Sequence, residues 1–219
     1  MKTVIAIDGP AASGKSTIAR KMACELGFGL VNSGGFYRAV TWWLLRMAGP
    51  DCTEAEAERL LAAARLESEF RSHEAVITVD GLDAWPHLRE ADVNRHVSEF
   101  SQFACVRSRL NSEFRKLAEQ QPCVVEGRDI GTCVFPETPH KFYLDASPEE
   151  RQKRRLAEGL VDEIQQRDRL DSGRQLAPLM AARDAHVIDT TKLGIEEATA
   201  LICSLLPQEL FQTHRDNRV

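Results

Sequence analysis

A continuous apolar run rich in β-branched residues occupies residues 3–7 near the start of the chain, TVIAI. Such a run is typical of a strand buried on both faces, as in parallel sheets covered by helices. Apolar residues then recur every four positions at Ile18, Met22 and Leu26, and Gly27 follows them. This spacing predicts a helix that ends at the glycine. Strand, loop and helix together form the first half of a βαβ unit.

Apolar runs and helical spacings continue to alternate along the rest of the chain. Strands are predicted at residues 30–31, 123–126, 141–145 and 186–189. Helices are predicted at residues 37–47, 54–64, 97–119 and 195–205. A further helix begins after Ser147, where Ser147, Pro148 and Glu150 form the pattern of a capping box. The alternation predicts an α/β fold, a three-layer sandwich around a parallel sheet.

One hairpin interrupts this alternation. Residues 74–81 have the pattern of a strand and a tight turn, and residues 82–85 follow as the partner strand. We therefore expect a small inserted subdomain at about 50–95, within a core formed by residues 1–49 and 96–219.

The composition is that of an ordinary globular protein, with 219 residues of which 43% are hydrophobic and 28% charged. A net charge of -5 argues against non-specific binding of nucleic acid, which needs a basic face. No run approaches the ~20 apolar residues of a membrane span, and we expect neither a membrane partner nor a signal peptide. The six cysteines have no zinc-site spacing, so we expect buried free thiols and a cytoplasmic location.

The strongest motif lies between the first strand and the first helix. Residues 9–16 are GPAASGKS and match the pattern G-x-x-x-x-G-K-[ST] of the P-loop. Its glycines let successive amides point at phosphate oxygens, its lysine meets the β- and γ-phosphates, and the Ser16 hydroxyl is a ligand for Mg²⁺. The fold class is thus a P-loop NTPase sandwich. The predicted ATP site consists of Gly9, Pro10, Ala11, Ala12, Ser13, Gly14, Lys15, Ser16 and Thr17.

Four arginines fall in loops near the predicted ends of strands, where ligands of open α/β sheets bind. They are Arg38, Arg128, Arg167 and Arg174. Any single one is more often a solvated surface residue, but four of them in an acidic chain favour an anionic ligand. A kinase of small phosphorylated acceptors holds two phosphate groups, so it needs more arginine than an ATPase does. The sequence has no N-K-x-D motif of the Ras-like GTPases.

Several longer stretches make the sequence similar to a known family. They are residues 5–17, 32–38 (NSGGFYR), 97–98 with 106–107, 126–136 (EGRDIGTCVFP), 142–147 (FYLDAS) and 167–179 (RDRLDSGRQLAPL). In these stretches and in their order, the chain resembles bacterial-type cytidylate kinases of the nucleoside monophosphate kinase group. The resemblance covers nearly the whole chain. It implies transfer of the γ-phosphate of ATP to CMP or dCMP, with Mg²⁺ as the metal.

The resemblance also implies a role for each matching residue. The residues around the acceptor phosphate and sugar would be Ser33, Arg38, Arg128, Arg167, Asp171 and Arg174, with Asp171 on the ribose hydroxyls. The residues that read the base would be Ser98, Arg107 and Asp129. A lid over ATP, at about 151–167, would begin with Arg151, Arg154 and Arg155. The catalytic set would be Lys15, Arg128, Arg167 and Arg174, and residues 50–95 would form the monophosphate-binding insert.

Two features depart from the family pattern. Asn32 stands where members of the family usually carry Asp, so the help that such a carboxylate gives to hydrated Mg²⁺ is in question. The stretch between Arg155 and Arg167 is short for a lid, which bears on closure and on ATP affinity.

An acceptor phosphate is already anionic near neutral pH, so the reaction requires no strong general base, and we assign none of the six histidines to catalysis. We expect a monomer that works by positioning and charge neutralisation. Two alternatives stay open at this point. The chain could be a P-loop kinase of another small phosphorylated acceptor, or a nucleotide-dependent switch that transfers nothing.

Overall fold

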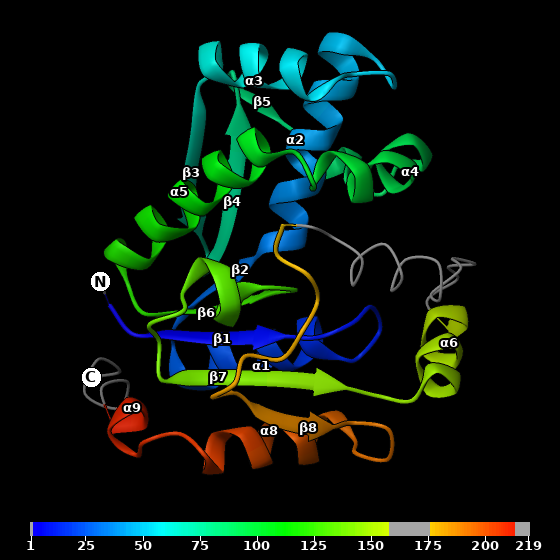
Figure 1. The fold of residues 1–219 in the computed structure, drawn as a ribbon. Helices are drawn as coiled ribbons and strands as arrows, with labels where there is room; N and C mark the ends of the chain where they lie inside the picture. Colours follow the sequence, from blue (N-terminus) through cyan, green and yellow to red (C-terminus); the bar gives the residue numbers. More distant parts are fainter. Residues whose placement is uncertain (1, 158–175, 213–219) are drawn as a thin grey trace.

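The computed structural model describes residues 2–157 and 176–212. Within them, strands and helices alternate as the sequence predicts and build one sheet with helices on both faces (Figure 1). Three predicted site residues, Arg167, Asp171 and Arg174, lie outside the described residues, as does most of the predicted lid.

Five strands form the parallel centre of the sheet. In spatial order they are β2 (Gly29–Asn32), β6 (Cys123–Gly127), β1 (Val4–Asp8), β7 (His140–Asp145) and β8 (His186–Asp189). Asp8, at the end of β1, lies opposite Gly127 of β6 and Tyr143 of β7. The carboxyl ends of the central strands therefore meet at one edge, where the loops that follow them can share a ligand.

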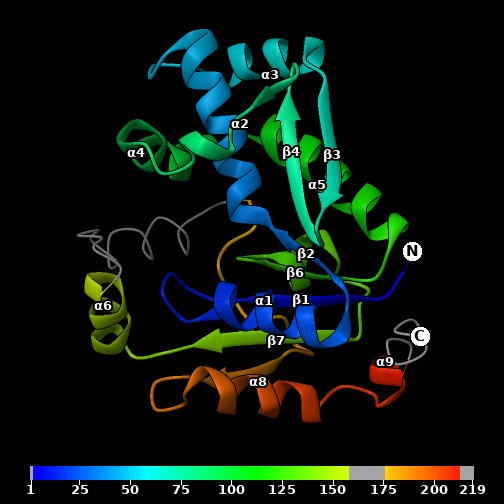
Figure 2. The same cartoon turned by 180° about the vertical axis from the view of Figure 1, so that it is seen from behind.

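Helices cover both faces of this sheet (Figures 1 and 2). They are α1 (Lys15–Leu26), α8 (Ile195–Ser204) and α9 (Glu209–Gln212) on one face, with α2 (Ser33–Ala48) and α5 (Ala104–Gln120) on the other. Ile5 of β1 belongs to the core beneath α1, whereas Val4 belongs to the core beneath α2. Because successive residues of β1 enter opposite cores, the run is apolar throughout. The predicted three-layer α/β fold is confirmed.

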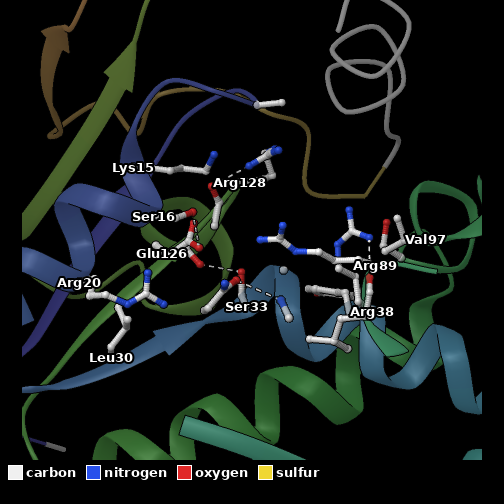
Figure 3. Close-up of a pocket in the computed structure, with 18 of the residues that line it drawn as sticks. Lys15, Ser16, Arg20, Leu30, Ser33, Arg38, Arg89, Val97, Glu126 and Arg128 are labelled. Atoms are coloured by element: carbon white, nitrogen blue, oxygen red, sulfur yellow. Dashed lines mark hydrogen bonds between the residues drawn. The ribbon is translucent and has the colours of Figure 1, made fainter. Parts of the chain in front are cut away.

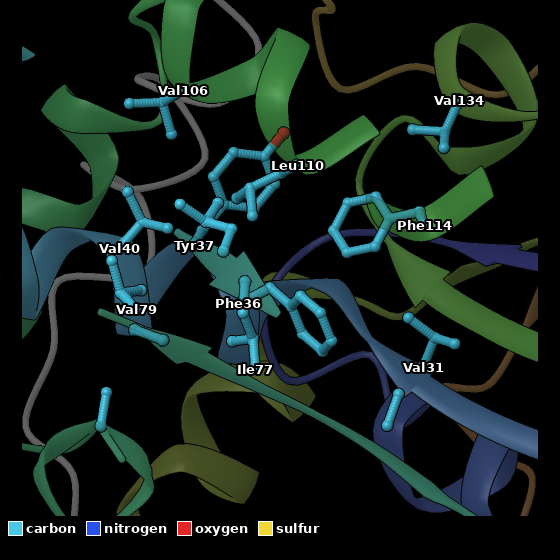
Figure 4. Packing of buried hydrophobic residues seen from close by; sticks show 14 of the residues in the cluster. Val31, Phe36, Tyr37, Val40, Ile77, Val79, Val106, Leu110, Phe114 and Val134 are labelled. Carbon is cyan, nitrogen blue, oxygen red and sulfur yellow. The ribbon is translucent and has the colours of Figure 1, made fainter. Parts of the chain in front are cut away.

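The larger core lies between the sheet and the helices α2 and α5 (Figure 4). Phe114 of α5 is completely buried there. Its ring centroid lies 5.2 Å from that of Phe36 and 6.4 Å from that of Tyr37, both on α2. This aromatic packing fixes the first turns of α2, which carry Ser33 toward the carboxyl edge of the sheet.

The region predicted as an insert adds a second set of strands to the same sheet. It contains α3 (Glu54–Ala63), β3 (Leu66–Arg71), β4 (Glu74–Val79), β5 (Leu82–Asp83) and the 3₁₀ turn η1 (Trp85–His87). The predicted hairpin is present as β4 and β5, but the longer antiparallel partner of β4 is β3, which the sequence did not reveal. Only Leu66 of β3 is buried, so LESEFR shows little apolar alternation. β4 joins β2 through the pair Leu30–Glu74, and the limits 50–95 remain a prediction.

The prediction of one helix over residues 97–119 is wrong. The structure has α4 (Ala91–Phe100) and α5, separated by a break at residues 101–103. Phe103 adopts an extended backbone with ψ of 124°, and its ring stacks on that of the buried Phe100 with 5.3 Å between centroids. Both flanking segments keep a helical spacing, so periodicity alone does not show the break.

The capping box predicted at Ser147 is half right. The Ser147 hydroxyl accepts a hydrogen bond from the Glu150 amide (3.2 Å) at the start of α6 (Pro148–Ala157). The Glu150 carboxylate accepts from Arg154 instead of turning back to the cap (3.1 Å). The Ser147 amide donates to Thr191 (2.8 Å), so tertiary contacts satisfy what the second half of the box would supply.

The cysteines are free thiols as predicted, but only some of them are buried. All six are free thiols, but only Cys52 and Cys123 are buried, whereas Cys24 and Cys133 are exposed. Burial raises the pKa of the Cys123 thiol to about 12, which keeps it protonated and unreactive.

Replacement of Phe114 tests the larger core. Phe114→Ala is expected to lower the free energy of unfolding by about 3–5 kcal/mol, because it removes a fully buried ring and leaves a cavity against Phe36. The control Leu201→Ala, at a side chain that is 42% exposed, is expected to cost less than about 1 kcal/mol. Urea denaturation measures both, and similar losses would contradict the assignment of Phe114 to the core.

Candidate active site

The loop that joins β1 to α1 has the backbone geometry of a phosphate-binding loop. Gly9 and Gly14 have φ of 151° and 89°, in the region that favours glycine. A Cβ on Gly9 would lie 2.1 Å from the Leu144 carbonyl oxygen, so no larger residue fits there. α1 begins directly after Gly14, and its amino-terminal amides face the loop that would hold an anion.

Lys15 and Ser16 stand at the start of α1. The Lys15 ammonium is buried and donates to the Pro10 carbonyl oxygen (2.8 Å), which keeps it within the loop. The Ser16 hydroxyl donates to the Glu126 carboxylate (2.8 Å). Glu126 was not among the predicted site residues. Its position near the carboxyl end of a buried strand, where it pairs with Ile7 of β1, was a signal for a place in the site.

A pocket of about 700 Å³ extends from this loop toward the insert. Figure 3 shows Lys15 and Ser16 at one end of it and Arg38, Arg89 and Val97 at the other. The predicted site residues that line it are Ala11, Ala12, Gly14, Lys15, Ser16, Thr17, Ser33, Arg38, Ser98, Arg128, Asp129 and Arg155. The pocket therefore joins the predicted ATP side to the predicted acceptor side.

Three arginines reach the acceptor side of the pocket. Arg38 of α2 donates to the Leu88 carbonyl oxygen (3.0 Å) and to the Asn94 side chain (2.6 Å), which ties it to the insert. Arg128 follows β6 and donates to the Gly127 carbonyl oxygen (3.5 Å). Arg89 also lines the pocket and was missed in the sequence, because nothing local distinguishes it from a surface arginine. Together they supply cations for an anionic ligand.

Ser33 and Asn32 shape the wall between the two sides. The Ser33 hydroxyl donates to the main-chain oxygen of Glu126 (2.7 Å), which joins α2 to β6. The Asn32 side chain accepts from the Gly35 amide (3.0 Å) and caps α2. A neutral amide is a good cap, so the residue that departs from the family pattern has a clear local function.

Arg107 and Asp129 form a buried ion pair beside the pocket. The Arg107 guanidinium donates to the Asp129 carboxylate, and the two side chains are only 7% and 5% exposed. Arg107 also donates to the Ser101 carbonyl oxygen (3.4 Å) and lies over the Tyr37 ring at 5.7 Å. The break between α4 and α5 makes this arrangement possible, because it turns the Ser101 carbonyl toward Arg107. The two residues that the resemblance assigns to the base are therefore paired with each other, and their role at the base stays a prediction.

The predicted lid arginines contact the phosphate-binding loop. Arg151 is buried and donates to the carbonyl oxygens of Ala146 (3.1 Å) and Ala11 (3.4 Å). Arg154 donates to the carbonyl oxygens of Ala12 (3.5 Å) and Thr190 (2.7 Å). Arg155 lines the pocket. All three belong to α6, and their role in a lid stays a prediction.

Asp8, the last residue of β1, is a buried carboxylate that the sequence analysis did not single out. It is 4% exposed and accepts hydrogen bonds from the amides of Ile130 (2.8 Å) and Gly131 (2.7 Å). Burial raises its pKa to about 7, and the two main-chain hydrogen bonds oppose that rise. Asp129 raises the pKa of Asp8 further and Lys15 lowers it, so both charges face this carboxyl.

The oxygen atoms of Ser16 and Glu126 fit Mg²⁺, which prefers hydroxyl, carboxylate and water oxygens. Among the described residues, no group of three or more His, Cys, Asp or Glu side chains could hold a metal ion. This donor set suits an ion held mainly by phosphate oxygens and water rather than by a cage of protein ligands.

Within residues 2–157 and 176–212, no helix is long and apolar enough to cross a membrane.

A parallel α/β sheet whose first strand leads into this loop and helix defines a P-loop nucleotide-binding protein. The family model described as cytidylate kinase matches residues 5–208. The chain therefore belongs to the cytidylate kinase family.

Curated relatives agree with this family. A cytidylate kinase of Caldanaerobacter subterraneus is 41% identical over 88% of this chain and 89% of its own length. One of Shouchella clausii is 38% identical over 95% of this chain and 97% of its own. A bifunctional pantoate ligase/cytidylate kinase of Synechococcus is 40% identical over 92% of this chain, which spans only 42% of that longer protein.

The raised pKa of Asp8 predicts a pH dependence of stability. An acid whose pKa is higher in the folded protein than in the unfolded chain destabilises the fold as pH rises between the two values, here from about 4 to 7. Asp8→Asn removes this ionisation. We compare the free energy of unfolding of the variant with that of the unsubstituted protein at each pH. The difference between the two is expected to shift by about 2–3 kcal/mol in favour of the variant as pH rises from 5 to 8.

Urea denaturation at both pH values measures that difference. The control Asp80→Asn changes an exposed carboxylate that also accepts a main-chain hydrogen bond, from the Arg65 amide (2.8 Å), and is expected to show a much smaller change with pH. A difference for Asp8→Asn that stays constant from pH 5 to pH 8 would contradict the prediction.

Proposed function

We propose that this protein transfers the γ-phosphate of ATP to CMP or dCMP and releases ADP with CDP or dCDP. One observation supports this most strongly: a single pocket of about 700 Å³ is lined both by the phosphate-binding loop and by Asp129 with Arg38, Arg89 and Arg128. Membership of the cytidylate kinase family supports the same reaction.

On the donor side, the amides of the loop and Lys15 bind the phosphates of ATP. Arg151, Arg154 and Arg155 lie beside that loop and close the donor site from α6. Ser16 would hold Mg²⁺ through its hydroxyl, and Glu126, which accepts from that hydroxyl, would orient the water around the ion. When bound, the ion neutralises charge on the β- and γ-phosphates.

On the acceptor side, Ser33, Arg38, Arg89 and Arg128 hold the monophosphate. The family resemblance adds Arg167, Asp171 and Arg174, which lie outside the described residues. Transfer forms a bond from an acceptor phosphate oxygen to the γ-phosphorus and breaks the bond to the ADP oxygen. The acceptor oxygen is already anionic, so Lys15 and the arginines contribute by positioning and by offsetting charge, without a general base.

At the base, Arg107 and Asp129 match the edge of cytosine. The N4 amino group is a donor and N3 is an acceptor, whereas uracil presents the reverse. A carboxylate only accepts and a guanidinium only donates, so Asp129 faces N4 and Arg107 faces N3, with Ser98 nearby on the pocket wall. With uracil, a carbonyl oxygen would face the Asp129 carboxylate, and neither group can donate a hydrogen bond to the other.

We expect the enzyme to act as a monomer. Six free thiols suit the reducing cytoplasm, where we expect it to act.

A coupled assay of ADP release with a panel of monophosphates tests this function. The expected order is CMP and dCMP well above UMP, AMP, GMP and dTMP. Preference for another monophosphate would support the alternative of a kinase with a different acceptor. Release of ADP that no acceptor stimulates would support a nucleotide-dependent switch.

Lys15→Ala is expected to abolish transfer, with kcat lower by a factor on the order of a thousand or more, because the charge is needed most in the transition state. The variant should keep a normal circular dichroism spectrum. A matched control is Lys116→Ala, whose ammonium lies on the surface of α5 and pairs with Glu113, and which should retain full turnover. Turnover near that of the unsubstituted protein in Lys15→Ala would overturn the role of the loop.

Asp129→Asn is expected to narrow the preference for CMP over UMP. We expect this preference to be about tenfold to a thousandfold in kcat/KM before substitution, since water can enter the pocket. The amide can also donate, so it tolerates the uracil carbonyl and loses part of its match to the cytosine amino group. Steady-state kinetics with both nucleotides measure the ratio. An unchanged ratio would exclude Asp129 as a reader of the base.

A further inference from the structure

A single turn of π-helix, η2 (Ile130–Val134), follows directly after Asp129. The first amides of any helical turn have no partner within it and need one from outside. Here the amides of Ile130 and Gly131 donate to the two carboxylate oxygens of Asp8, at 2.8 and 2.7 Å. The cap of this turn is thus supplied by β1, from a residue more than a hundred positions away.

Asp129 occupies the N-cap position of the same turn, where an aspartate ordinarily accepts from the next amides itself. Its side chain makes no capping hydrogen bond. It lies instead against Arg107, in an ion pair that is almost fully buried. Two aspartates are therefore close to one turn, and they have different partners.

We infer that Asp8 is a positioning residue for the acceptor: by capping η2 in place of Asp129, it keeps the Asp129 carboxylate on Arg107, where the base is read. The inference rests on the proposed function for the identity of the base. Without the cap from Asp8, the two amides would compete with Arg107 for the Asp129 carboxylate.

The same carboxylate links the two halves of the site. Asp8 directly precedes Gly9 of the phosphate-binding loop, and in the sheet it lies opposite Gly127, the residue before Arg128. The hydrogen bonds that Asp8 accepts from the amides of Ile130 and Gly131 therefore hold the segment that carries Arg128 and Asp129 at a fixed distance from the loop. In-line transfer needs such a fixed distance between donor and acceptor phosphates, since a misplacement of about 1 Å can cost a hundredfold in rate.

Two substitutions remove this cap in different ways. Asp8→Asn keeps the size of the side chain but turns one acceptor into an NH₂ donor, which meets an N–H of the turn. Gly131→Ala keeps the carboxylate but adds a Cβ that would lie 3.4 Å from Asp8 Oδ2 and 3.2 Å from Lys141. Lys141 is held by Pro136 and Asp184, which limits how far its side chain can give way, so we expect the turn to shift by a few tenths of an ångström.

A control removes a comparable buried hydrogen bond at the other end of β1. The Thr138 hydroxyl is buried and donates to the Val4 carbonyl oxygen (2.5 Å), far from the pocket. Thr138→Val is expected to lower the melting temperature but to leave acceptor kinetics as they are.

For both Asp8→Asn and Gly131→Ala, the expected result is a KM for CMP raised about tenfold or more and a lower ratio of CMP to UMP in kcat/KM. The dissociation constant of a fluorescent ATP analogue, measured in the absence of acceptor, should change by less than about threefold, because the loop amides and Lys15 remain. If Asp8 had a purely structural role, the substitutions would instead lower the melting temperature. They would then weaken the binding of both ligands to the same extent or leave both unchanged.

The inference is overturned if both variants keep the CMP to UMP ratio of the unsubstituted protein, or if ATP binding weakens as much as CMP binding. It is likewise overturned if Thr138→Val changes the ratio to the same extent. Failure of the proposed function has a different signature, since the unsubstituted protein would then prefer another monophosphate. The kinetics of the variants would in that case be read with the preferred acceptor, and a raised acceptor KM with unchanged ATP binding would still support Asp8.

Discussion

The parallel register of β1 between β6 and β7 is the constraint on which the site depends. It sets Asp8 opposite Gly127, so the phosphate-binding loop and the segment with Arg128 and Asp129 leave the sheet at the same level. Glu126, one residue earlier, reaches Ser16 at the start of α1. Burial of β1 on both faces enforces this register, because a slip by one residue would exchange the side chains that enter the two cores.

A residue of the site could be predicted from the sequence where its function depends on its neighbours along the chain. The phosphate-binding loop was predictable, since its glycines and lysine have their function within eight residues of chain. The strands of the parallel centre were predictable because each contains a run of apolar residues, from two in β2 and β8 to four in β1. Glu126 and Asp8 were not assigned to the site, because each bonds to a residue far away in sequence. Arg89 was not assigned because nothing local distinguishes it from a surface arginine. A carboxylate at a strand end is the one local signal that could have found Glu126 and Asp8.

The break between α4 and α5 shows a second limit of sequence reasoning. Residues 97–119 keep helical spacing throughout, whereas in the structure Phe103 has an extended backbone and its ring stacks on Phe100 between the two helices. That packing is a tertiary effect, so no period in the sequence reports it. In a continuous helix the Ser101 carbonyl oxygen could not accept a hydrogen bond from Arg107, so the break matters for the site. The resemblance to a family names Arg107 and Asp129 as residues for the base, which stays a prediction, and it gives no hint of the turn that brings the Ser101 carbonyl to Arg107.

The charges along the pocket follow the charges of the proposed ligands. Along the path proposed for the phosphates, Lys15, Arg38 and Arg128 donate to carbonyl oxygens, and an anionic phosphate oxygen is a stronger acceptor than a carbonyl. At the base end, Arg107 and Asp129 are a neutral pair, and the base is also neutral. Burial of a lone charge there would be costly, whereas a pair offers one strong donor and one strong acceptor at a smaller cost of desolvation. A neutral pair can therefore discriminate between bases by the order of donor and acceptor alone, which is the property that separates cytosine from uracil.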